Sequence, residues 1–126
     1  MHPLQAMING FNDDSQRQRA KTQMTLGGMI ERLSQLDPDM QIDGLAEPHS
    51  YRGYYVDLAF ETSDAMPVSE MLSMANDCMG ETFEGYKGGD FTMGRTTPVW
   101  IADYGCCGLR LMGINDDGTF VTAKDD

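Results

Sequence analysis

Apolar residues recur with helical spacing in two stretches of the chain. In residues 24–36 an apolar stripe follows Thr25, a good N-cap residue, and Pro38 lies just beyond the last apolar position. In residues 68–79 the apolar positions again recur every three to four residues, and Gly80 suits the position that follows a helix end. The pattern therefore predicts two amphipathic helices.

Strict alternation of side chains predicts a half-buried strand over residues 54–61. Further strands are predicted over residues 41–45, 82–84, 91–93, 97–102, 109–114 and 119–123. The last two flank residues 115–118, Asn-Asp-Asp-Gly, which are a strong turn signal and predict a hairpin.

This order of elements, with mostly short connections, predicts a single α+β domain in which two helices pack on one face of a mainly antiparallel sheet. We assign residues 24–126 to this domain and expect it to bind a ligand. Residues 1–23 lack a clean periodicity and are expected to form an N-terminal extension that is partly flexible. A short helix ending near Gly10 is the alternative for part of this extension.

Charge narrows the possible partners. The chain has 126 residues, with 9 Lys+Arg against 20 Asp+Glu and a net charge of −11. This charge argues against general binding to nucleic acid or to an anionic membrane, but it allows a small anion in a local positive pocket. No apolar run approaches the roughly 20 residues that cross a bilayer, and the first residues do not resemble a signal peptide. A cytoplasmic location is expected.

Cysteine and histidine spacing predicts no metal site. Cys78, Cys106 and Cys107 form neither a disulfide framework nor a zinc-binding spacing with His2 and His49. We expect three reduced thiols, no bound metal and no cofactor.

Two clusters combine glycine, aromatic rings and a cation. The first cluster, residues 48–55, contains Arg52, and the second cluster, residues 83–92, contains Lys87. Glycine lets backbone N–H groups approach a ligand, while aromatic faces stack on planar rings, so the combination suits a nucleotide. Turn glycines with cation–π packing at the rim of a sheet are the structural alternative. The candidate ligand-binding residues are His49, Ser50, Tyr51, Arg52, Tyr54, Phe83, Tyr86, Lys87, Gly88, Gly89, Asp90 and Phe91.

No residue is assigned a catalytic role. His49 and Ser50 are neighbours, and neighbours on an extended chain point to opposite sides, so they do not form a dyad. His49 oriented by Asp90 is a conceivable general base, but the spacing does not require it. We therefore expect a binding protein rather than an enzyme.

Several segments resemble small proteins of tailed bacteriophages. They are Met24-Thr25-Leu26-Gly27, His49-Ser50-Tyr51-Arg52-Gly53-Tyr54-Tyr55, Leu58-Ala59-Phe60-Glu61, Thr82 to Met93, and Thr97-Pro98-Val99-Trp100. Over about residues 24–104 the chain resembles the Thoeris anti-defence sponges of the first type. The resemblance implies that it binds a cyclic ADP-ribose signal of the host immune system, in the host cytoplasm, and sequesters it without cleavage. It also implies a homo-oligomer with sites between subunits, and it leaves room for separate cyclic oligonucleotide sites. It does not extend to individual ligand residues.

A second function remains open. The acidic chain could be a protein–protein inhibitor of a nucleic-acid-binding defence complex, of the anti-CRISPR or anti-restriction type. Such a mimic needs acidic residues concentrated on one face, whereas here they are scattered over turns and termini. The sequence therefore favours sequestration of a cyclic nucleotide.

Overall fold

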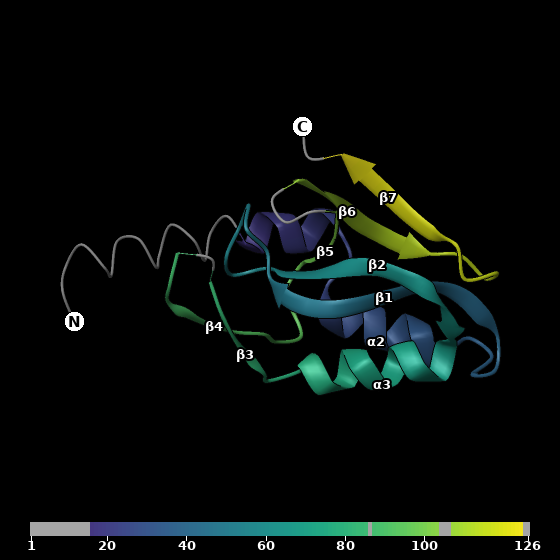
Figure 1. Cartoon of the computed structure of the whole chain (residues 1–126). Helices are drawn as coiled ribbons and strands as arrows, with labels where there is room; N and C mark the ends of the chain where they lie inside the picture. Colours follow the sequence, from purple (N-terminus) through teal and green to yellow (C-terminus); the bar gives the residue numbers. More distant parts are fainter. Residues whose placement is uncertain (1–15, 86, 104–106, 125–126) are drawn as a thin grey trace.

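The computed structural model describes residues 16–85, 87–103 and 107–124. The strands of its main sheet are β1 (Gln41–Ser50), β2 (Leu58–Pro67), β5 (Val99–Asp103), β6 (Cys107–Ile114) and β7 (Phe120–Lys124). They lie in the order β1-β2-β5-β6-β7 (Figure 1), and every neighbouring pair is antiparallel except β2 and β5. The predicted α+β class with a mainly antiparallel sheet is confirmed.

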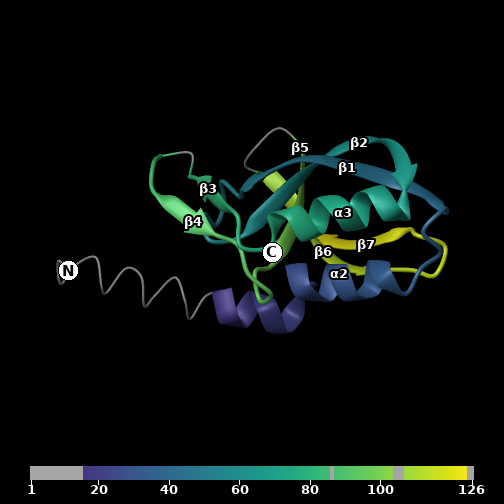
Figure 2. The same cartoon turned by 90° about the horizontal axis from the view of Figure 1, so that it is seen from below.

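Two helices cover one face of this sheet, as Figures 1 and 2 show: α2 (Leu26–Ser34) and α3 (Val68–Cys78). The Thr25 hydroxyl caps α2 by accepting a hydrogen bond of 3.1 Å from the Gly28 amide. Both predicted helices are thus confirmed, and each of their ends lies within two residues of the expected position. Within the described part of the chain, no helix has the length and apolar character to cross a membrane.

A small hairpin interrupts the path from α3 to β5. Its strands β3 (Thr82–Glu84) and β4 (Asp90–Thr92) form a two-stranded sheet of their own. Both strands were expected from the sequence, but their separation from the main sheet was not. Together, α3 and this hairpin form the crossover that makes β2 and β5 parallel, because parallel neighbours cannot be joined by a tight turn. The second cluster of the sequence is this hairpin.

The pairing of β2 with β5 divides the interior into two cores. Leu58 and Phe60 belong to the large core beneath α2 and α3. The intervening Ala59 pairs with Trp100, and both belong to a smaller core on the opposite face. A helical segment, residues 16–22, lies on that opposite side (Figure 1) and will be called the N-terminal helical segment. Residues at both faces of the central strands are therefore buried.

Several strand boundaries differ from the prediction. The largest difference is at the end of β2, which runs to Pro67 and not to residue 61, because its second half still pairs with β1. The strand expected over residues 54–61 begins only at Leu58, because residues 51–57 form a loop closed by two backbone hydrogen bonds. In these bonds the Tyr51 amide donates to Asp57 and the Asp57 amide donates to Tyr54, each at 2.9 Å. The strand expected over residues 41–45 continues to Ser50, since β1 pairs with β2 up to Ser50 despite irregularities between Ile42 and Gly44 and between Ala46 and His49.

Candidate functional site

The two clusters of the sequence lie next to each other in space. The loop of residues 51–57 carries the first cluster, and the β3–β4 hairpin carries the second. The rings of Tyr55 and Phe91 join them, with centroids 5.9 Å apart and ring planes tilted by 42°. The segments predicted to bind one ligand therefore form one continuous region of the molecule.

Two tyrosines of the first cluster contribute to the smaller core. The Tyr51 ring stacks on Trp100 at 4.4 Å between centroids, and its exposed fraction is 3%. Its hydroxyl also accepts a hydrogen bond of 3.0 Å from the Gly108 amide. The Tyr54 ring lies 5.6 Å from Trp100 and is partly buried. Both rings position the loop, and Tyr51 has almost no surface left for a ligand.

A buried ion pair fixes the same loop. The Arg19 guanidinium donates to both carboxylate oxygens of Asp57, at 2.6 and 3.0 Å, and lies 3.9 Å from the centre of the Tyr54 ring. The Trp100 indole N–H donates to the same carboxylate at 2.8 Å. Burial raises the pKa of Asp57 above its usual value, although the hydrogen bonds from Arg19 and Trp100 act in the opposite direction.

The side chains of His49 and Ser50 both contact polar atoms of the protein. His49 Nδ1 lies 2.9 Å from the Ser50 carbonyl oxygen, and its Nε2 lies 3.5 Å from a carboxylate oxygen of Glu61. The Ser50 hydroxyl donates to the Tyr55 carbonyl, and Ser50 is only 3% exposed. The carboxylate beside His49 is therefore Glu61, whereas the sequence suggested Asp90.

The remaining candidates lie nearer the surface. Arg52, Phe83 and Phe91 are half-buried, while Lys87, Gly88, Gly89 and Asp90 are exposed; Tyr86 lies outside the described residues. Gly88 and Gly89 have φ angles of 97° and 87°, which side chains rarely adopt, so the turn requires glycine. The Gly88 amide donates to the Gly85 carbonyl at 2.9 Å. This amide is therefore used by the turn and is not directed at a ligand.

One pocket beside the second cluster is acidic. Its volume is about 490 Å³, and it is lined by Pro48, Met74, Asp77, Cys78, Glu81 and Phe83. Burial, reinforced by the charges of Asp77 and Glu81, raises the pKa of the Cys78 thiol to about 11. The same negative charges repel an anion, so Phe83 faces surroundings that do not favour a phosphate.

Sequence reasoning missed the residues that organise this region. Arg19, Asp57, Trp100 and Arg110 were not among the candidates, although the Arg110 guanidinium lies 6.0 Å from the Trp100 ring centre. The one available signal was a lone charge at position 57 in an otherwise apolar stretch. Its partner, 38 residues earlier, could not be identified without the fold.

The described residues contain no group of three or more His, Cys, Asp or Glu side chains placed to hold a metal ion. Comparisons with models of protein families, with curated proteins and with solved structures gave no match to this chain. A functional proposal therefore depends on the arrangement of the residues and on the resemblance seen in the sequence.

Proposed function

We propose that the protein binds a cyclic nucleotide signal and sequesters it without cleaving it, as a phage-type anti-defence protein. The observation that carries the proposal is the contact between Tyr55 and Phe91, which brings the two clusters into one region. Arg52 and Lys87, separated by 34 intervening positions in the sequence, thereby belong to neighbouring segments. The resemblance to phage sponges supplies the class of ligand, cyclic ADP-ribose isomers or cyclic oligonucleotides.

The chemistry of the exposed and half-buried residues suits such a ligand. A guanidinium such as that of Arg52 can bind a phosphate through two parallel hydrogen bonds, and the ammonium of Lys87 supplies a point charge. Half-buried aromatic rings such as Phe91 can stack on a base while remaining fixed by the protein. Ser50 and Tyr51, being buried, would support the site from beneath.

Holding the ligand fits the region better than cleaving it. A hydrolase needs a nucleophile or a base whose reactive atom reaches the substrate. The Ser50 hydroxyl is buried and donates to Tyr55, and both ring nitrogens of His49 lie against protein oxygens. These contacts support a binding role for the first cluster.

The proposal is tested by calorimetric titration of the purified protein with cyclic ADP-ribose isomers and cyclic di- and trinucleotides. After each titration the protein is heat-denatured, and the released ligand is analysed by chromatography. We expect one of these compounds to bind and to be recovered intact. Recovery of an altered ligand would identify an enzyme, and absence of binding by every compound would refute the proposal.

Variants identify the residues involved. We expect Arg52→Gln and Lys87→Gln each to weaken binding about tenfold or more, since a hydrogen bond to a charged group contributes roughly 1.5–3 kcal/mol. Lys124→Gln, an equal loss of charge on the exposed end of β7, is the matched control and should bind like the wild type. Sedimentation with and without ligand would reveal the homo-oligomer that the resemblance implies.

One observation favours the second candidate, an acidic inhibitor of a nucleic-acid-binding protein. The acidic pocket beside α3 combines Asp77 and Glu81 with an apolar wall, which suits a lysine or arginine side chain of a partner. Such an inhibitor would keep its activity in the Arg52→Gln and Lys87→Gln variants. Its binding would also weaken steeply with salt, whereas binding of a small ligand in a closed pocket would weaken less.

A further inference from the structure

An irregularity in the pairing of β1 with β2 determines where the His49 side chain points. Before the irregularity Ala46 pairs with Glu61, and after it His49 pairs with Ala59. A regular ladder would have placed His49 opposite Leu58, which belongs to the large core. The extra residue on β1 instead turns His49 to the face that carries Ala59 and Glu61, on the side of the smaller core.

The irregularity contains an unfavourable backbone conformation. Glu47 lies within it and has a φ angle of 50°, in the left-handed region that residues other than glycine rarely adopt. Within the described residues, it is the only non-glycine residue with a positive φ angle. Such a conformation persists where the surrounding structure imposes it, and it is common at functional sites. Here it accompanies the approach of His49 to Glu61.

Hydrogen bonding fixes which nitrogen of the His49 ring carries the proton. Its Nδ1 atom lies 2.9 Å from the Ser50 carbonyl oxygen, and a carbonyl oxygen can only accept a hydrogen bond. Nδ1 is therefore the donor, and Nε2 has no proton when the ring is neutral. Nε2 lies 3.5 Å from the Oε2 atom of Glu61. A neutral His49 thus directs a lone pair at a carboxylate oxygen.

This carboxylate oxygen lacks a donor of its own. Glu61 Oε2 is buried, and no hydrogen-bond donor among the described residues reaches it. A buried charged oxygen without a partner is unfavourable. One additional proton, on Nε2, converts the two facing acceptors into an ion pair. The side chains of His49 and Glu61 are 32% and 26% exposed, so water can deliver this proton.

The neighbouring charged groups do not replace this proton. In the described part of the chain, no ion pair joins a third side chain to His49 or to Glu61. Asp57 is held by Arg19. The strands and the loop around the pair also carry Glu47, Arg52, Glu84 and Arg110.

We propose that His49 and Glu61 form a proton-operated switch, which stabilises the end of β1 and the loop of residues 51–57 when one proton is bound. Ser50 connects the pair to this loop, because its carbonyl accepts from His49 and its hydroxyl donates to the Tyr55 carbonyl. The inference goes beyond the proposed function, since the switch needs no ligand.

The sign of the pH dependence follows from the pairing. Histidine side chains ordinarily take up their second proton near about pH 6.5. An imidazolium that gains a carboxylate partner on folding adds stability that is complete below this range and is lost as the pH rises through it. The loop that carries the first cluster should therefore be held more firmly in mild acid than at pH 8.

The test is a double-mutant cycle with His49→Gln, Glu61→Gln and the double variant, in which urea unfolding of the full-length chain is measured at pH 5.5 and at pH 8. At pH 5.5 we expect the two side chains to be coupled by about fivefold in the folding equilibrium constant. At pH 8 this coupling should disappear or change sign. Glu61→Gln should lower stability only at pH 5.5, because its amide N–H group can donate to Nε2 of a neutral ring.

Arg32 and Asp116 are the matched control, because they also form an ion pair but arginine and an exposed aspartate are charged at both pH values. A cycle with Arg32→Gln and Asp116→Asn should give the same coupling at pH 5.5 and pH 8. Nuclear magnetic resonance of the His49 ring nitrogens in the wild type adds a readout that needs no variant. Equal His49–Glu61 coupling at the two pH values, or a neutral ring that carries its proton on Nε2, would overturn the inference.

Discussion

Asp57 is fully buried, and the cost of placing its charge there is offset by its partners. Removing one member of a buried ion pair leaves the other charge without compensation, which typically costs 3–5 kcal/mol. Here the carboxylate also accepts the indole hydrogen bond of Trp100. The region of the candidate site thus depends on one residue that would not itself touch a ligand.

Asp57→Ala should therefore lower the free energy of unfolding by about 3–5 kcal/mol. The measurement is urea denaturation followed by circular dichroism. Asp116→Ala is the matched control, because Asp116 pairs with Arg32 at 2.6 Å but is 97% exposed. A surface ion pair contributes less than about 1 kcal/mol. If both variants lose the same stability, the buried pair does not have this role.

Strands β1 and β2 flank the loop of the first cluster and pair with each other. Their pairing is irregular between Ile42 and Gly44. At Gly44 the two strands approach so closely that a Cβ atom would overlap the Asp64 carbonyl oxygen and the Ser63 hydroxyl. Gly113 lies beside a similar irregularity between β6 and β7, but there a Cβ atom would meet nothing within 4 Å. The two glycines thus have different roles in similar settings.

Gly44→Ala should destabilise the protein by at least about 2 kcal/mol, because the strands would have to separate to admit the methyl group. Gly113→Ala should change the stability by less than about 1 kcal/mol, since the side chain enters open space. Thermal unfolding of both variants measures the difference. Equal midpoints for the two variants would show that the close approach at Gly44 does not constrain the sheet.

At the scale of the whole molecule, the sheet has a layer on each face. The two longer helices cover one side, and the N-terminal helical segment lies with residues 51–57 on the other (Figure 1). The backbone of Met24 connects the layers, since its amide donates to the Leu111 carbonyl and its carbonyl accepts from the Val99 amide. Residues 16–23 contribute to the fold as well, because Arg19 pairs with Asp57 and the Gln23 side chain donates to the Val99 carbonyl.

A chain that begins at residue 24 should be less stable than the full chain by more than about 3 kcal/mol, because Asp57 would lose Arg19. The fluorescence of Trp100, the single tryptophan, should shift to longer wavelength as water reaches the smaller core. Urea denaturation and emission spectra of the two chains provide the test. Identical spectra and midpoints would show that residues 1–23 are only an appendage.

Local patterns were sufficient for most elements. The Thr25 cap and apolar stripe predicted α2, and Gly80 marked the end of α3. The strands on either side of the glycine-rich turn were placed within one residue of β3 and β4. The start of β2 was missed because alternation continues through Tyr54 and Val56, where a loop held by a distant arginine replaces the strand. Strand pairing decides such boundaries, and local periodicity does not reveal it.

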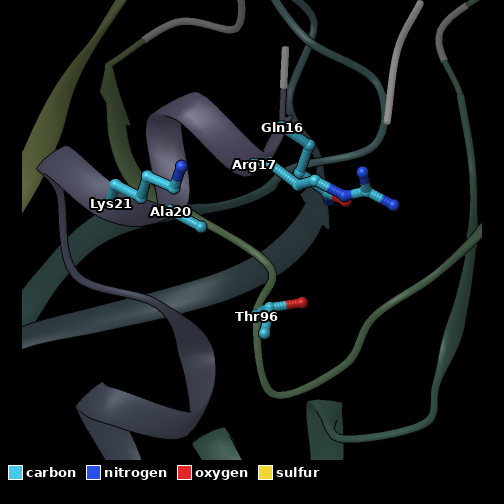
Figure 3. Close-up of a pocket in the computed structure, with 5 residues that line it drawn as sticks. All are labelled: Gln16, Arg17, Ala20, Lys21 and Thr96. Atoms are coloured by element: carbon cyan, nitrogen blue, oxygen red, sulfur yellow. The ribbon is translucent and has the colours of Figure 1, made fainter. Parts of the chain in front are cut away.

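For the candidate region, the sequence determined which residue types are present and which segments are rich in glycine and aromatic rings. Only the tertiary structure decided which side chains remain accessible. In the fold, Tyr51 is buried against Trp100, and the His49 ring lies beside the Glu61 carboxylate. Arg17, Lys21 and Thr96 line one pocket (Figure 3), although Thr96 is far from the other two in the sequence. The physical reason is that accessibility and charge pairing depend on contacts between residues far apart in the chain, which local composition does not specify.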